Sequence, residues 1–221
     1  MSDLDDLYGV LCNVEAQHGL IQLYIQSQSE CTRNGVCGME IGMAREKDLG
    51  AVLKLFLQEK INLNIDNTLP EDYVVGTSKI SVKHASTKVG STVKVKWTAA
   101  DTPVSDAITA IINADDAYYP NLLILYLDKV GKKIVVVCIA AETNRNVIKT
   151  LRERAFKVPK GNSRGIEYSK EAMAELMKAK YFEVRMADVD WTMGQDPIER
   201  RIQYLQSIGI GSHYGRQIVE I

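Results

Sequence analysis

Two apolar runs, residues 121–127 and 134–141, constrain the fold of this 221-residue chain more than any other feature. Each run has the length of a strand, and the segment 128–131 between them holds a glycine and reads as a turn. A strand with one wet face alternates apolar and polar residues, so a strand that is apolar at every position must be covered on both faces. We therefore expect strands over 121–127 and 132–140 in a sheet with helices on both sides.

Helical and strand patterns surround these two runs. Apolar residues recur at helical spacing in one or two segments within 3–28 and again within 44–60, with a polar loop over 29–38. Further helices are predicted over 103–113, 144–154 and 169–178, a strand over 181–187, and a last helix that Asp196, Pro197 and Glu199 would cap. This order predicts an α/β fold, a mixed central β-sheet flanked by helices, in a single domain over residues 1–221.

Composition narrows the classes of function. The chain is 46% hydrophobic and 25% charged, with a formal net charge of -1, which excludes a protein that coats nucleic acid by bulk positive charge but allows a segregated basic face. The cysteines at 12, 31, 37 and 138 have no C-x-x-C spacing, so no structural zinc site is expected. The apolar runs are shorter than the roughly 20 residues that span a bilayer, and the acidic start is unlike a signal peptide. A cytoplasmic protein without a membrane segment is expected.

The segment 73–100 carries the first chemical signal. Alternating residues at 79–83 and 93–97, with a glycine turn near 88–91, predict an antiparallel hairpin. No acidic residue lies between Asp72 and Asp101, whereas basic side chains are frequent there: Lys79, His84, Lys83, Lys88, Lys94 and Lys96. A solvated strand face is the ordinary interpretation of such lysines. The alternative is a positive surface for an anionic partner.

Acidic residues stand where they could complete a catalytic site. Period-2 alternation puts Lys79, Ser81 and Lys83 on one face of their strand, directly after Glu71 and Asp72. Glu46 is predicted on the opening turn of the preceding helix. Carboxylates of this kind can hold Mg²⁺, which polarises a phosphodiester and acidifies a bound water, and a lysine can orient that water.

Pro70-Glu71-Asp72 followed by Ser81-Val82-Lys83 resembles the signature of the PD-(D/E)xK nucleases, and residues 42–141 resemble the catalytic core of type II restriction endonucleases. The resemblance implies a restriction-endonuclease-like core and a Mg²⁺ cofactor. It implies the following roles: Asp72 and the Val82 carbonyl as metal ligands, Glu46 as a direct or water-mediated ligand, Lys83 as the catalytic lysine, and Glu71 as a fallback for Asp72. The signature has an acid where this chain has Ser81, so the metal-binding count is an open question.

Residues 142–221 are predicted to supply DNA-recognition and dimer elements. Basic residues cluster from 145 to 164, on a helix and on a loop rich in glycine, asparagine and serine. Arginine and asparagine are the usual partners of guanine and adenine edges, so we expect Arg164 and Asn162 at bases, Ser163 beside them, and Lys157 and Lys160 on phosphates. A helix-capping loop with a solvated basic rim is the competing interpretation.

Together with these residues, the resemblance implies a Mg²⁺-dependent, sequence-specific endonuclease of double-stranded DNA that leaves 5′-phosphate and 3′-hydroxyl ends, as that family does. Cutting both strands of a palindrome implies a homodimer, and the resemblance implies a companion DNA methyltransferase. The alternatives are a repair or recombination nuclease on the same fold and a DNA-binding module without catalysis. A nucleotide-handling protein is not favoured, because the G-x-x-x-x-G-K phosphate loop is absent.

Overall fold

The computed structural model describes residues 2–35, 39–64, 71–85, 87–98, 102–128, 131–159 and 165–186. The helices of this part are α1 (Asp3–Cys12), α2 (Val14–Arg33), α3 (Met39–Leu57), α4 (Val104–Asn113), α5 (Ala141–Leu151) and α6 (Lys170–Lys178). Its strands are β1 (Ile61–Leu63), β2 (Tyr73–Val75), β3 (Ser78–Ala85), β4 (Lys94–Trp97), β5 (Asn121–Asp128), β6 (Lys133–Ile139), β7 (Phe156–Lys157), β8 (Gly165–Tyr168) and β9 (Phe182–Met186). None of the described helices is long and apolar enough to cross a membrane.

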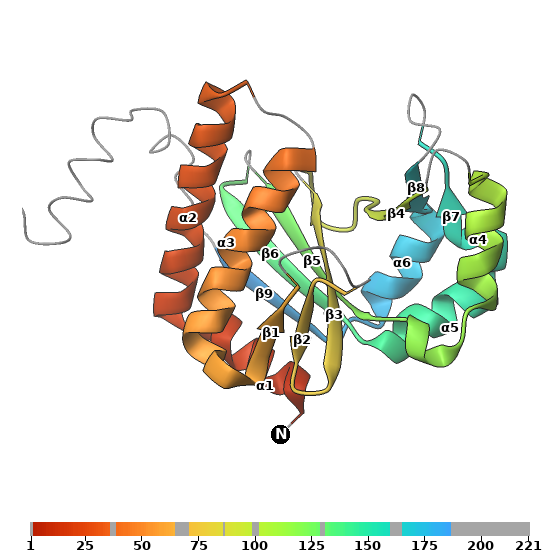
Figure 1. The fold of residues 1–221 in the computed structure, drawn as a ribbon, viewed down its shortest axis with the longest axis horizontal. Helices are drawn as coiled ribbons and strands as arrows, with labels where there is room; N and C mark the ends of the chain where they lie inside the picture. The colour runs from red at the N-terminus through yellow and green to blue at the C-terminus, as the bar shows by residue number, and fades with distance from the viewer. Residues whose placement is uncertain are drawn as a thin grey trace, which may run out of the picture.

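A six-stranded mixed sheet in the order β1-β2-β3-β5-β6-β9 forms the centre of the molecule, and a three-stranded sheet in the order β4-β8-β7 lies beside it (Figure 1). Strands β5 and β6 pair antiparallel from Leu122↔Ile139 to Asp128↔Lys133. The first seven residues of β5 are buried, as are the last six of β6. The prediction of two central strands covered on both faces is confirmed.

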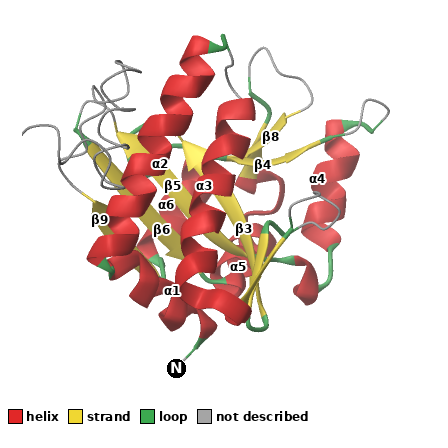
Figure 2. Cartoon of the chain, turned by 60° about the vertical axis from the view of Figure 1, so that its left-hand side comes forward, coloured by secondary structure: helices red, strands yellow, loops and turns green. Residues whose placement is uncertain are grey.

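Two layers that differ in their secondary structure cover the two faces of the central sheet. Helices α1, α2 and α3 pack on one face, and we call them the scaffold layer; Figure 2 shows them in front of the strands. The other face carries α4, α5, α6 and the three-stranded sheet, which we call the cavity layer. Alternate residues of β5 point to the two layers, since Leu123 and Leu125 join the scaffold cluster and Leu122 and Ile124 join the other. The predicted α/β fold with a mixed sheet flanked by helices is confirmed.

The predicted hairpin between 79–83 and 93–97 is wrong, although both segments are strands. Strand β3 pairs with β2 on one edge and runs parallel to β5 on the other, so neither edge is left for β4. Strand β4 instead pairs antiparallel with β8. The actual hairpin joins β2 to β3 through Gly76, whose φ of 56° lies in the left-handed region that glycine tolerates best.

Helix boundaries also differ from the expectation. Helix α2 continues to Arg33, well into the segment predicted as a loop, and α3 begins at Met39. Glu46 therefore lies two turns inside α3 and not on its opening turn, because helix formers precede the apolar stripe that defined the prediction. The predicted helix after Asp196 lies outside the described residues, and the single domain over 1–221 stays a prediction.

Candidate active site

Strand β3 presents its two faces to different surroundings. Ile80 and Val82 are buried in the scaffold cluster. Lys79, Ser81 and Lys83 line a cavity of about 370 Å³ under the cavity layer. The predicted shared face of these three residues is therefore confirmed, and the strand turns its polar residues toward a hollow.

Asp72 joins this face from the residue before β2. Its N–H donates to the Ile80 carbonyl at 2.9 Å, which extends the pairing of the hairpin by one residue. Its Oδ2 accepts hydrogen bonds from the Val82 N–H and from Ser81 Oγ, the latter at 3.2 Å, and lies 3.9 Å from Lys83 Nζ. The structure thus brings Asp72, Ser81 and Lys83 together as the sequence predicted.

Glu46 approaches from α3 and shares an electrostatic environment with this group. Burial, and after it the Asp72 carboxylate, raise the pKa of Glu46 to about 7, and Lys83 opposes the shift. The Tyr73 hydroxyl donates to the backbone carbonyl of Glu46, which ties α3 to β2. Two carboxylates that repel each other make an oxygen-rich place for a hard divalent cation.

The donor set is small. Within the described ranges no group of three or more His, Cys, Asp or Glu side chains could hold a metal. Glu46 and Asp72 with a backbone carbonyl supply few protein oxygens, and a cation there would complete its coordination with water. That pattern suits Mg²⁺, which keeps several waters and is usually bound by one or two carboxylates.

Glu71 is the most enclosed carboxylate of the site. It is 6% exposed and lines the same cavity as Lys83. Its Oε1 lies 3.9 Å from Lys79 Nζ, and its Oε2 has no hydrogen-bond partner among the described residues. The sequence marked Glu71 only as a fallback for Asp72, because an unpartnered oxygen is a property of the assembled surroundings.

His84, predicted to contact DNA, faces the scaffold layer. Its Nε2 lies 3.1 Å from the Tyr24 hydroxyl of α2. Burial and the positive charges of Arg45 and Lys83 lower the pKa of His84 to about 3, so the ring is neutral at ordinary pH. The structure places His84 on the face of β3 opposite Lys83, where it ties β3 to α2.

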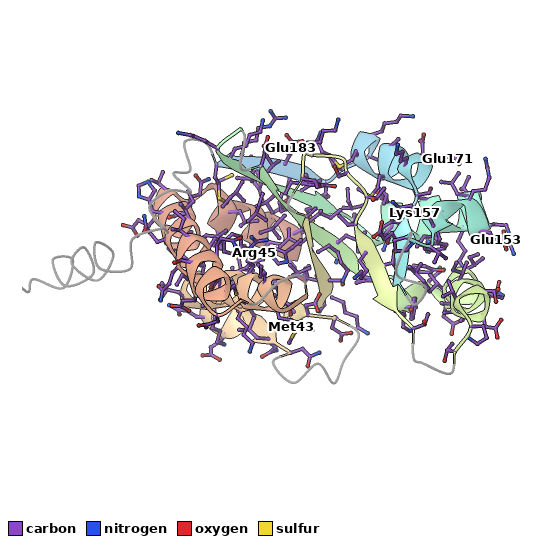
Figure 3. All side chains as sticks on the ribbon, turned by 90° about the horizontal axis from the view of Figure 1, so that it is seen from above. Met43, Arg45, Glu153, Lys157, Glu171 and Glu183 are labelled. Atoms are coloured by element: carbon purple, nitrogen blue, oxygen red, sulfur yellow. The ribbon has the colours of Figure 1, made fainter. Side chains whose placement is uncertain are left out.

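The other predicted DNA-binding residues are spread over the cavity side. Lys88 and Lys96 are exposed, Lys96 lines the cavity, and Lys94 is half-buried. Lys157 in β7 pairs with Glu167 at 3.0 Å, and Figure 3 shows it on the side of Glu153 and Glu171, away from α3 with Met43 and Arg45. The remaining predictions, Lys160, Asn162, Ser163 and Arg164, lie outside the described residues.

Sequence reasoning missed the far wall of the cavity. Tyr118, Asn144 and Tyr168 line it, and the Tyr168 hydroxyl donates to Asn144 Oδ1 at 2.7 Å. Asn144 is 2% exposed, and its Nδ2 donates to the Pro120 carbonyl at 3.2 Å. A polar residue in the buried stripe of α5 was the one available signal, and it pointed to no particular partner.

Comparison with known proteins gives concordant findings. A family model described as "Restriction endonuclease ThaI" matches residues 10–196. A solved structure described as "Restriction endonuclease in complex with substrate DNA" is similar to this chain with a TM-score of 0.68 and 21% sequence identity, over 87% of this chain and 93% of that one. At that identity the likeness shows a shared fold. No curated protein matches the chain.

Proposed function

The chain belongs to the restriction endonuclease ThaI family, and on that premise we propose how its residues cut DNA. As a member of that family it is a type II site-specific deoxyribonuclease. We further propose that it cuts both strands of duplex DNA with Mg²⁺, leaves 5′-phosphate and 3′-hydroxyl ends, works as a homodimer and has a companion methyltransferase. Two related active sites in a symmetric dimer would serve the two strands of a palindrome.

One observation carries the catalytic proposal. Asp72 Oδ2 is held by the Val82 N–H and Ser81 Oγ while it lies 3.9 Å from Lys83 Nζ. Backbone and hydroxyl donors fix the direction of the carboxylate. A fixed carboxylate beside a lysine that lines a cavity is suited to hydrolysis of a phosphodiester.

Glu46, Asp72 and the Val82 carbonyl are the proposed metal ligands. Bound Mg²⁺ would supply Lewis-acid polarisation of the phosphate and an acidified water. The Glu46 carboxyl, with its pKa raised to about 7, is poised to be held in the charged form by a cation. Ser81, which stands where the signature has an acid, acts in this proposal through its hydrogen bond to Asp72 and not as a ligand.

Lys83 is the proposed catalytic lysine. Its Nζ can orient the attacking water and offset the negative charge that develops on the phosphate. Lys79 and Lys96 line the same cavity and are proposed to contact the DNA backbone. Lysine contacts to phosphates are the same for any base sequence. These contacts would therefore position the duplex, and other groups would determine which sequence is cut.

Incubation of the purified protein with long unmethylated phage DNA, with and without Mg²⁺, tests the proposal. Discrete fragments that need Mg²⁺ and are lost in Lys83→Ala and Asp72→Ala are expected, and sequencing their ends gives the target and the end chemistry. Lys133→Ala is the matched control, because Lys133 forms a comparable ion pair with Asp128 at 3.8 Å on the opposite side of β5.

Two other results would change the assignment. Nicking or smearing without discrete fragments would favour the repair or recombination alternative. Uncut DNA with a retained band shift in all variants would contradict catalysis at this site and leave a binding module. Sedimentation of the free and DNA-bound protein tests the dimer separately.

A further inference from the structure

The unpartnered oxygen of Glu71 has no role in the chemistry proposed above. The Glu71 side chain is 8% exposed, and its Oε2 accepts no hydrogen bond from any residue in the described part of the chain. Buried polar atoms are nearly always paired in native proteins, and a buried carboxylate oxygen without a donor is costly to maintain. Such an atom on the wall of a substrate cavity indicates that a donor arrives with the substrate.

The surroundings of Glu71 restrict the chemistry of that donor. Lys79, Lys83 and Lys96 line the same cavity, so positive charges outnumber the Glu71 carboxylate there. A single carboxylate that faces three ammonium groups is a poor site for a further metal cation. A polyanion that carries a neutral N–H donor would meet the needs of the lysines and of Glu71. The phosphates of the polyanion would pair with the lysines, and the N–H would donate to Glu71.

Nucleobases in DNA carry such donors. Cytosine N4, adenine N6 and guanine N2 are exocyclic amines exposed at base edges, and carboxylates accept from cytosine N4 in known complexes. Apolar and aromatic side chains form much of the remaining wall, including Ile111, Tyr118 and Tyr119. A base edge is apolar around its polar atoms and fits a wall of this kind.

We propose that Glu71 accepts a hydrogen bond from the exocyclic amine of a base beside the scissile phosphate and so helps to determine which sequence is cut. Glu71 precedes Asp72 in the chain and shares a cavity with Lys83, which places it next to the point of cleavage. The inference rests on the proposed function, because the base is located relative to the phosphate that Asp72 and Lys83 would act on.

Movement of the Lys79 side chain would give a base access to Glu71. Its side chain is 50% exposed and its contact with Glu71 is long, at 3.9 Å. Partly exposed ion pairs of this length hold weakly. Lys79 turns to a phosphate when DNA enters, and this movement leaves the Glu71 carboxylate open to the base.

The test removes one amine at a time from a duplex that contains the target. Pyrimidin-2-one replaces cytosine, purine replaces adenine and inosine replaces guanine, and binding is measured with Ca²⁺ in place of Mg²⁺ so that the DNA stays intact. For the wild-type protein, removal of one amine next to the cut is expected to weaken binding roughly 10-fold or more. In Glu71→Met, which keeps the length of the side chain but has no oxygen, the same removal is expected to have no effect.

Glu71→Gln and Glu175→Met complete the design. Glu71→Gln keeps one neutral acceptor and should retain part of the sensitivity; it also serves if Glu71→Met fails to fold. Glu175, on α6, forms an exposed ion pair with Lys178, so Glu175→Met should respond as wild type.

Three results would overturn the inference. The first is that no removal of an amine beside the cut weakens DNA binding by the wild-type protein. The second is that a Glu71 variant stays as sensitive to amine removal as the wild-type protein. The third is that a Glu71 variant binds all duplexes equally more weakly and has an altered metal requirement, which would make Glu71 a metal ligand. Failure of the wild-type protein to cut any DNA would instead contradict the proposed function.

Discussion

The scaffold layer and the cavity layer cover opposite faces of the same sheet but differ in what they enclose. Under the scaffold layer, Leu7, Leu53 and Ile80 are 0% exposed and belong to one apolar cluster. Under the cavity layer, the same strand β3 turns Lys79, Ser81 and Lys83 toward a hollow of about 370 Å³. Since alternate residues of one strand serve the two layers, substitutions at neighbouring positions should separate stability from catalysis.

The largest effect is expected for Lys83→Ala. We expect the cleavage rate to fall about 1,000-fold, because the group that would orient water and offset charge is removed. The melting temperature should stay close to that of wild type, since the ion pair with Asp72 is 3.9 Å long and partly exposed. Single-turnover cleavage and thermal melting measure the two effects. A variant that cuts normally would remove the catalytic role from the cavity face.

Ile80→Ala should produce the opposite result. Ile80 is fully buried in the scaffold cluster, and truncation of such a side chain lowers the free energy of unfolding by about 2–5 kcal/mol. Cleavage per folded molecule should be retained, because the side chain points away from Lys83. Urea denaturation and activity at low temperature test this. Loss of activity without loss of stability would break the separation of the two faces.

A smaller effect is expected for Ser81→Ala. The hydroxyl donates to Asp72 Oδ2, and a hydrogen bond to a charged group contributes about 1.5–3 kcal/mol. The Val82 N–H still holds the carboxylate, so we expect a loss of cleavage of roughly 10-fold and a loss of unfolding free energy near the lower end of that range, about 1.5 kcal/mol. Ser81→Ala and Asp72→Ala compared at a range of Mg²⁺ concentrations give the measurement. A loss as large as that of Asp72→Ala would make Ser81 more than a positioning residue.

The smallest effect concerns pH and lies in the scaffold layer. The Thr77 N–H donates to Asp3 Oδ2 at 2.9 Å and the Thr77 hydroxyl at 3.1 Å, and these bonds lower the pKa of Asp3 below its ordinary 3.8. A lowered folded pKa means that the stabilisation is present above pH 3.8 and is lost as the pH falls through the folded value. Wild type should therefore melt at a slightly higher temperature than Asp3→Asn at pH 6, and the difference should shrink as the pH falls below 3.8. An unchanged difference would contradict this.

The sequence predicted best what depends on burial. Strands β5 and β6 were found because residues apolar on both faces have few other places in a fold, and most helices were found from their apolar stripes. The partner of β4 was not found, since alternation identifies a strand but is the same for any neighbour. Strand β4 cannot pair with β3, because β5 pairs with the edge of β3 that β2 leaves free.

The candidate site divides in the same way. Asp72, Ser81 and Lys83 were grouped by local spacing and by the family signature, and the structure brings them together. The burial of Glu71 depends on groups distant in sequence, such as those of α5 and β8 that line the cavity. No short-range pattern could predict which oxygen would be left without a donor.

The parallel pairing of β3 with β5 has a consequence for how the enzyme is made. Antiparallel strands can meet through a short hairpin, but parallel strands need a long crossover, and here β3 ends at Ala85 while β5 begins at Asn121. Strand β4 pairs with β8, which begins only at Gly165 and is therefore synthesised much later. On the ribosome, Asp72 and Lys83 therefore emerge well before the segments that hold them in place. The nascent chain is expected to be unable to cleave DNA until most of it has been synthesised, which delays the onset of a potentially lethal activity in the cell that makes it.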